Sequence, residues 1–165
     1  MRRLKKQLQI ENYQLKLDIL KFVFILMRVM VFGTFDNLHP GHENYFLQAS
    51  RFGALLIVIV ARDKNVLQIK GRLPRQTEMD RVKGARAALK KLNIPGRAVL
   101  GGLKNRWQVL KKYQPKVIAL GYDQQVDLKK LKSELSQARL FCKIKRLKAY
   151  QPERYKSSYC LDKTK

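Results

Sequence analysis

The stretch "FGTFDNLHPGH" (residues 32–42) places a glycine turn, an aspartate and two histidines between an apolar run and an expected helix. The glycine permits a tight turn with the backbone close to a ligand. The Pro-Gly pair then opens a helix, whose free amide groups and dipole favour a phosphate. His39 and His42 are three residues apart, so both rings can face the same side. Two imidazole donors at a helix start suit an oxyanion better than a metal ion, for which Asp36 would be the nearby third ligand.

Outward from this stretch, apolar runs alternate with amphipathic segments. The run "ALLIVIVA" is continuously apolar, as expected for a central parallel strand covered on both faces. The pattern predicts an α/β fold, a Rossmann-like doubly wound five-stranded parallel sheet with helices on both faces. The expected strands are 28–32, 54–61, 97–102, 116–123 and 140–150, and the expected helices are 40–53, 76–93, 106–114 and 127–139.

Polar segments follow three of the expected strands. They are "GTFDNLHPGH" after the first strand, "RDKN" after the second and "GYDQ" after the fourth. In open parallel sheets a ligand lies beyond the carboxyl ends of the strands, at the point where the strand order reverses. We therefore expect these three segments to meet at one rim and to form a ligand site there.

The chain is strongly basic, with 36 Lys and Arg against 12 Asp and Glu and a net charge of +24. Such an excess indicates anionic partners, among them nucleotides, phosphorylated metabolites, nucleic acid or an acidic membrane, unless the host's proteins are lysine-rich in general. The hydrophobic content of 45% argues against disorder. The two cysteines lack the spacing of zinc ligands, which argues against a structural zinc site.

The first 27 residues differ from the rest, being basic and polar at first and apolar afterwards. No uncharged stretch there reaches the length of a membrane span, and no signal-peptide cleavage site follows. We expect residues 1–27 to be a helical or mobile extension, with a natural start at Met27 or Met30 as the alternative. The expected domain covers 28–158, and 159–165 form a C-terminal tail.

The sequence "GTFD" followed by "HPGH" resembles the signature of the HIGH-type nucleotidyltransferases, in their cytidylyltransferase-like branch. The resemblance covers about residues 28–158. "VARDK", "LGGLKN" and "ALGYDQ" together are most similar to archaeal-type FAD synthases, whereas cytidylyltransferases tend to have a second acidic residue where Tyr122 stands. The chain departs from the family where a Ser/Thr-rich motif usually caps a final helix. "RYKSSYC" offers two serines there, but seven residues follow them, so the final helix is expected to be absent or vestigial.

The resemblance implies nucleotidyl transfer, in which an acceptor phosphate oxygen attacks the α-phosphorus of a nucleoside triphosphate and pyrophosphate leaves. No protein nucleophile is needed, so catalysis rests on positioning and charge neutralisation. Asp36 would orient the acceptor or a metal, and Mg²⁺ is expected with the triphosphate rather than as a directly protein-bound metal. The implied catalytic residues are His39, His42, Lys70 and Arg81, of which Lys70 and Arg81 would hold the β- and γ-phosphates. The implied nucleotide-binding residues are Thr34, Phe35, His39, Pro40, Gly41, His42, Asp123, Tyr150, Ser157 and Ser158.

Three functions are compatible with these observations. The favoured function is transfer of AMP from ATP to FMN, giving FAD and pyrophosphate. The alternatives are transfer of CMP from CTP to a small acceptor such as glycerol 3-phosphate, and binding of nucleic acid by a degenerate nucleotidyltransferase fold. A cytoplasmic location, the absence of a membrane span and possible homodimerisation are further expectations.

Overall fold

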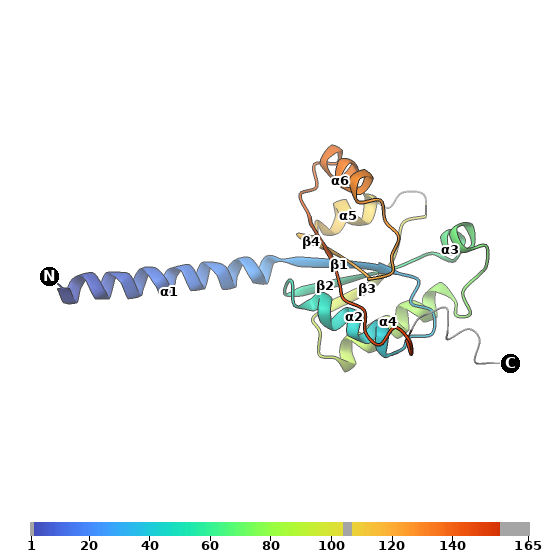
Figure 1. Ribbon diagram of the computed structural model, residues 1–165, viewed down its shortest axis with the longest axis horizontal. Coiled ribbons are helices and arrows are strands. Elements are labelled where there is room, and N and C mark those ends of the chain that lie inside the picture. Colours follow the sequence, from blue (N-terminus) through green and yellow to red (C-terminus); the bar gives the residue numbers. More distant parts are fainter. Residues whose placement is uncertain (1, 104–106, 156–165) are drawn as a thin grey trace.

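A computed structural model describes residues 2–103 and 107–155 of the chain. A sheet of five parallel strands in the order β3-β2-β1-β4-β5 forms the centre of the domain (Figure 1). The chain builds outward from β1 to β3 and then returns to the other side of β1, so the strand order reverses between β1 and β4. The strands are β1 (Arg28–Gly33), β2 (Leu55–Val60), β3 (Gly96–Leu100), β4 (Val117–Leu120) and β5 (Lys143–Arg146).

Helices cover both faces of the sheet, because the strand residues are apolar on both sides. Leu56 and Val58 of β2 pack in one buried cluster with residues of α2 and α4, whereas Ile57 lies in a second cluster with residues of α5 and α6. Figure 1 shows these two helix pairs on opposite sides of the strands. The predicted doubly wound fold is therefore confirmed. The helices are α2 (Pro40–Ser50), α4 (Glu78–Lys91), α5 (Trp107–Tyr113) and α6 (Leu128–Gln137).

Two strands are shorter than the sequence predicted. β4 ends at Leu120 rather than at residue 123, and β5 covers only Lys143–Arg146 of the expected range 140–150. The residues beyond β4 form a turn and do not continue the strand. In this turn the side-chain amide of Gln124 donates to the backbone carbonyl of Phe32. These polar residues are thereby available at the carboxyl rim of the sheet.

Helix α3 (Asp63–Lys70) was not predicted, since its "RDKN" start was assigned to a polar segment after β2. Asp63 in its first turn and Lys70 in its last complement the helix dipole. Gly71 ends it in the left-handed conformation, at a φ of 69°. The missed helix stands at the carboxyl end of the strands, away from α1 (Figure 1).

Gly53, the last residue of the expected helix 40–53, lies outside helix α2. Helix α2 ends at Ser50, and Arg51 caps it in an ordinary right-handed conformation. A Cβ atom at Gly53 would lie 2.5 Å from the carbonyl oxygen of Met27. The glycine is therefore required for the close approach of this loop to the start of β1.

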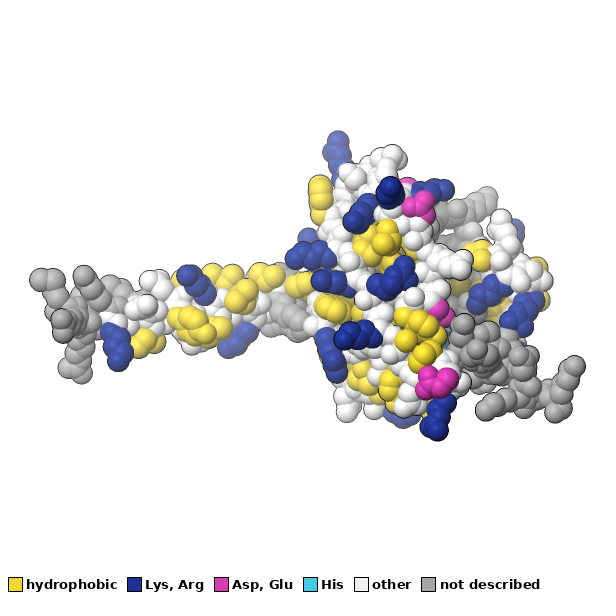
Figure 2. Space-filling view, in the orientation of Figure 1, with side chains coloured by type: hydrophobic (Ala, Val, Ile, Leu, Met, Phe, Trp, Pro, Cys, Tyr) yellow, Lys and Arg dark blue, Asp and Glu magenta, His cyan; other side chains and the backbone are white. Residues whose placement is uncertain are grey.

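The N-terminal extension forms a helix, α1 (Arg2–Leu26), which projects away from the domain (Figure 1). Both hydrophobic and basic side chains are visible along this helix (Figure 2). On the domain, basic side chains are scattered over the visible face instead of forming one patch (Figure 2). Among the described residues, no helix has the length and apolar character needed to cross a bilayer.

Candidate active site

The turn after β1 has a strained backbone that its surroundings hold in place. Phe35 and Asn37 have φ angles of 53° and 49°, in the left-handed region that non-glycine residues rarely adopt. The ring of Phe35 is buried and lies edge-on to Phe46 and His42. A Cβ atom on Gly33 would come within 2.7 Å of this ring. Burial of the Phe35 ring thus fixes the turn, whose residues line the cleft.

His39 caps the N-terminus of α2 with its ring. Its backbone is extended, and its Nδ1 atom accepts a hydrogen bond from the Gly41 amide at 3.2 Å. Because Nδ1 accepts, the proton of the neutral ring lies on Nε2. Pro40 occupies the first turn, where a missing amide hydrogen has no cost. Because Nδ1 of His39 caps the helix, the ring of His39 is held in one orientation with its Nε2–H group free to donate to a ligand.

The His39 ring is stacked on that of His42, with centroids 3.9 Å apart. Nε2 of His39 and Nδ1 of His42 are buried without a hydrogen-bond partner among the described residues. Such atoms cost about 1–3 kcal/mol each when unpaired. The pair is therefore arranged to receive a polar ligand, and phosphate oxygens match the helix N-terminus beside it.

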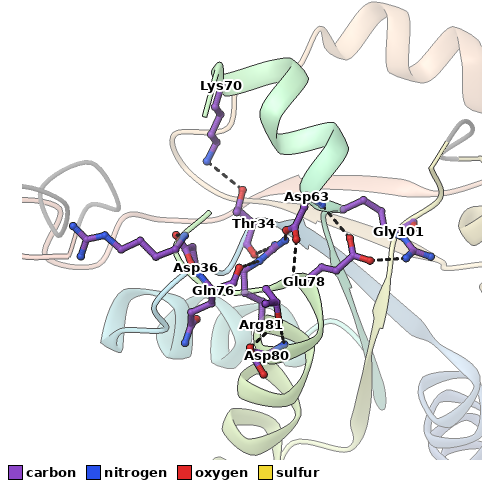
Figure 3. Close-up of polar contacts among 12 residues, drawn as sticks. Thr34, Asp36, Asp63, Lys70, Gln76, Glu78, Asp80, Arg81 and Gly101 are labelled. Atoms are coloured by element: carbon purple, nitrogen blue, oxygen red, sulfur yellow. Dashed lines mark hydrogen bonds and ion pairs between the residues drawn. The ribbon is translucent and has the colours of Figure 1, made fainter. Parts of the chain in front are cut away.

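Burial makes both rings neutral at physiological pH. It lowers the pKa of His39, and it lowers the pKa of His42 to about 3. The positive charge of Lys70, and that of His39 when it is protonated, contribute to the shift of His42, whereas the Asp36 carboxylate opposes it. Positive charge at the site comes instead from Lys70, whose Nζ donates to Thr34 Oγ1 at 3.1 Å (Figure 3). The site thus combines neutral hydrogen-bonding rings with the Lys70 ammonium group, which is bonded to the turn.

Arg81 lies behind the turn and not in the cleft. Its guanidinium is fully buried, donates to the carbonyl oxygens of Thr34 at 2.5 Å and Gln76 at 3.3 Å, and pairs with the Asp63 carboxylate (Figure 3). Asp63 and Glu78 each accept the other's backbone amide. The structure thus does not bring Arg81 to the cleft where the predicted phosphate contact would lie, because three of its nitrogen atoms donate within the protein and the side chain has no exposed surface.

Asp36 binds the loop between α3 and α4 to the turn after β1. Its two carboxylate oxygens accept the backbone amides of Arg75 at 2.8 Å and Gln76 at 3.0 Å. The side chain of Gln76 in turn accepts the amide of Asn37 at 3.0 Å. The carboxylate that was expected to orient the acceptor or a metal therefore holds the backbone of this loop in place. The described part of the chain contains no cluster of three or more His, Cys, Asp or Glu that could hold a metal ion.

The opposite wall of the cleft comes from the ends of β4 and β5. Gln124 donates to the carbonyl of Phe32 at 2.6 Å and accepts the amide of Gly121 at 3.0 Å, which joins the rims of β1 and β4. Nη1 of Arg146 donates to the carbonyls of Gly121 and Gln124 at 2.9 Å. The turn that carries Asp123 is therefore held from both sides.

Two tyrosines extend the row of stacked rings along the cleft. Tyr155 is parallel to His39 with centroids 6.1 Å apart, and Tyr150 is parallel to Tyr155 at 6.0 Å. Gln48 of α2 exchanges two hydrogen bonds of 3.0 Å with the backbone of Lys148. These bonds bring the segment after β5 back over the start of α2.

A cleft of about 1070 Å³ brings most of the predicted residues together. Pro40 and Arg81 do not line it, and Ser157 and Ser158 lie outside the described residues. Sequence reasoning missed Tyr155, Gln124 and Asp63. The "GYDQ" and "RDKN" segments were singled out, but the pattern gave no sign of which side chains hold the backbone and which face the ligand. The predicted residues that line the cleft are Thr34, Phe35, Asp36, His39, Gly41, His42, Lys70, Asp123 and Tyr150.

The fold and the cleft define a doubly wound α/β protein with its candidate site at the reversal of strand order. The family model described as Cytidylyltransferase-like matches residues 30–163, and the chain belongs to this family. This confirms the predicted resemblance.

Relatives and solved structures agree with this assignment. A protein of Methanosarcina mazei named FAD synthase is 40% identical over 124 residues, which are 74% of this chain and 78% of the relative. An Archaeoglobus profundus protein of the same name is 39% identical over 134 residues, with 81% and 82% covered. The crystal structure of a Thermoplasma volcanium protein, described as a lipopolysaccharide core biosynthesis protein, superposes with a TM-score of 0.68 at 34% identity, covering 76% of this chain and 98% of the other.

Proposed function

We propose that this protein is an FMN adenylyltransferase, which transfers AMP from ATP to FMN and releases pyrophosphate. Membership of the cytidylyltransferase-like family and the similarity to archaeal proteins named FAD synthase support this proposal. The observation that carries it is the stacked pair of His39 and His42 at the start of α2, whose buried Nε2 and Nδ1 atoms, respectively, have no hydrogen-bond partner in the described part of the chain.

The reaction is an in-line displacement at the α-phosphorus of ATP. A phosphate oxygen of FMN forms the new P–O bond while the bond to the leaving pyrophosphate breaks, so the protein has to hold reactants and charge and supplies no nucleophile. Nε2–H of His39 would donate to a phosphate oxygen on which negative charge grows. A neutral donor in a water-poor site strengthens as that charge develops, which favours the transition state over the ground state.

Lys70 would supply the positive charge that the neutral histidines lack. Its Nζ donates a hydrogen bond to Thr34 Oγ1 in the turn after β1, so the ammonium group lies where phosphates would approach α2. Arg81 would act through the backbone, because its bond to the Thr34 carbonyl fixes the turn on which that contact depends. Asp123 and Tyr150 line the other wall, where we place the adenosine part of ATP.

Magnesium would enter the site bound to the triphosphate. Phosphate oxygens and water suit its octahedral preference, and a site of this kind needs few protein ligands. When bound, the ion would neutralise part of the phosphate charge. We place the reaction in the cytoplasm, and homodimerisation stays a prediction.

The direct test is incubation of the purified protein with FMN and either ATP or CTP, with FAD and pyrophosphate quantified. Formation of FAD with ATP supports the proposal. Release of pyrophosphate with CTP and glycerol 3-phosphate, without FAD formation from ATP and FMN, would assign the protein to the cytidylyltransferase alternative.

A further inference from the structure

One wall of the cleft carries exposed apolar side chains. Ile69 on α3 is 82% exposed and Leu73 on the following loop is 60% exposed, and both line the cleft together with Val66 and Pro74. Burial of apolar surface is favourable at about 25 cal/mol per Å². A group of exposed apolar side chains on the wall of a ligand cleft therefore indicates a ligand with an apolar surface of its own.

Cations alternate with these apolar residues along the same segment. Lys70 and Arg72 also line the cleft, on either side of Gly71. An arginine presents a planar fork that matches a phosphate, and a lysine adds a point charge. The wall thus matches a molecule that has both a phosphate and a broad apolar surface.

The wall is in place before any ligand binds. The loop after α3 is fastened to the turn after β1 by the Asp36 carboxylate, which accepts the amides of Arg75 and Gln76. A site held in this way avoids the entropic cost of ordering a loop on binding.

We infer that this wall is the acceptor subsite, and that it receives the isoalloxazine ring of FMN on Ile69, Leu73 and Pro74, with Lys70 and Arg72 at the FMN phosphate. The inference rests on the proposed function and names the residues that select its acceptor. The flavin ring system is large, flat and partly apolar, so it would cover Ile69 and Leu73. Glycerol 3-phosphate has the phosphate but no such surface, and it would leave both side chains in water.

The first experiment uses Ile69→Ser and Leu73→Ser, with Leu67→Ser as the matched control. Leu67 lies on the same helix and is 45% exposed, but it does not line the cleft. We expect each of the two cleft variants to raise the KM for FMN about tenfold, as loss of one buried apolar side chain would. The KM for ATP and the thermal unfolding midpoint should stay unchanged, because both residues are exposed. Leu67→Ser should behave as the wild type.

A second experiment separates the ring from the phosphate without turnover. Quenching of flavin fluorescence measures binding of FMN and of riboflavin, which lacks the phosphate. Ile69→Ser should weaken binding of both flavins by a similar factor, whereas Arg72→Gln should weaken FMN and leave riboflavin unaffected. If the wild type makes FAD while both Ile69→Ser and Leu73→Ser keep its KM for FMN, the subsite assignment is wrong and the proposed function stands. If the wild type makes no FAD from ATP and FMN, the proposed function is wrong, and so is the subsite assignment that rests on it.

Discussion

The imidazole of His39 lies on that of His42 with 3.9 Å between ring centroids and 28° between ring planes. Two charged imidazolium rings would repel each other at this distance, and burial disfavours charge on either one. The stacking is therefore compatible with neutral rings, which act as hydrogen-bonding groups toward phosphate oxygens.

Replacement of His39 by Asn should lower kcat by about 10² to 10³, the usual loss when one donor to a developing oxyanion is removed. Asn is a good N-cap, so α2 should still begin at the same residue and stability should change little. Initial rates of pyrophosphate release measure kcat, and urea unfolding checks the fold. A folded His39→Asn protein with wild-type kcat would contradict the role assigned to Nε2.

Stability should fall as the pH falls below the ordinary histidine pKa of 6.5. The pKa of His42 is lowered to about 3 in the folded protein, so between these values the unfolded chain binds the extra proton. One such proton lowers the free energy of unfolding by up to about 1.4 kcal/mol per pH unit. His39, whose pKa is also lowered, acts in the same direction.

Urea unfolding at several pH values between 7.5 and 4.5 measures this dependence for the wild type and for His42→Gln. Carboxylates titrate in both proteins, so the difference between the two curves isolates the histidine. The curve of the variant should be flatter, and parallel curves would show that His42 is not neutral in the folded state.

Arg81→Met should lower the free energy of unfolding by about 3 kcal/mol, because it leaves the Asp63 carboxylate and the Thr34 carbonyl without their partner. Asp63 retains 34% of its side-chain exposure, which keeps the loss below that of a fully buried pair. Arg81→Lys should recover little stability, since an ammonium cannot reach all three acceptors at once.

The same variants test whether Arg81 positions the turn. We expect Arg81→Lys, assayed well below its melting temperature, to lose kcat while the KM for ATP stays within about twofold. A large rise in the KM for ATP at constant kcat would instead indicate direct phosphate contact, as the sequence had predicted.

Gly33→Ala and Gly71→Ala should differ in effect, although each replaces a glycine at the end of an element. At Gly33 the new methyl group would meet the ring of Phe35 at 2.7 Å, so we expect a loss of about 1–3 kcal/mol together with reduced activity. At Gly71 nothing lies within 4 Å of the added atom, and the cost of about 1 kcal/mol comes from the left-handed backbone alone. Equal effects on activity would contradict the close packing of the turn.

The fold and the position of the site were predictable from the sequence because both depend on local patterns. The apolar run in β2 indicated a strand covered on two faces, and the polar segments at strand ends indicated the rim. Helix α3 was missed because its polar start resembles a loop, and its main sequence signal was Gly71 after Lys70.

The roles of Arg81 and Asp36 were not predictable in the same way. Both side chains are of types that bind phosphate or metal, and both lie near the turn after β1. Which of them faces the ligand depends on tertiary hydrogen bonds to backbone groups of Thr34, Arg75 and Gln76, and no local sequence pattern predicts those bonds. Local pattern therefore locates a site, whereas long-range contacts decide which of its polar groups remain available.

The bonds from Asp36 to the amides of Arg75 and Gln76 involve only backbone groups of the loop. Mutation can therefore change the side chains of Arg72, Leu73 and Pro74 without breaking these bonds, provided that Gln76, whose side chain accepts the amide of Asn37, and the number of residues in the loop are kept. A protein built in this way can evolve toward new acceptors by point substitution while its chemistry stays the same. Insertions or deletions in that loop would be selected against, because they would displace the turn itself.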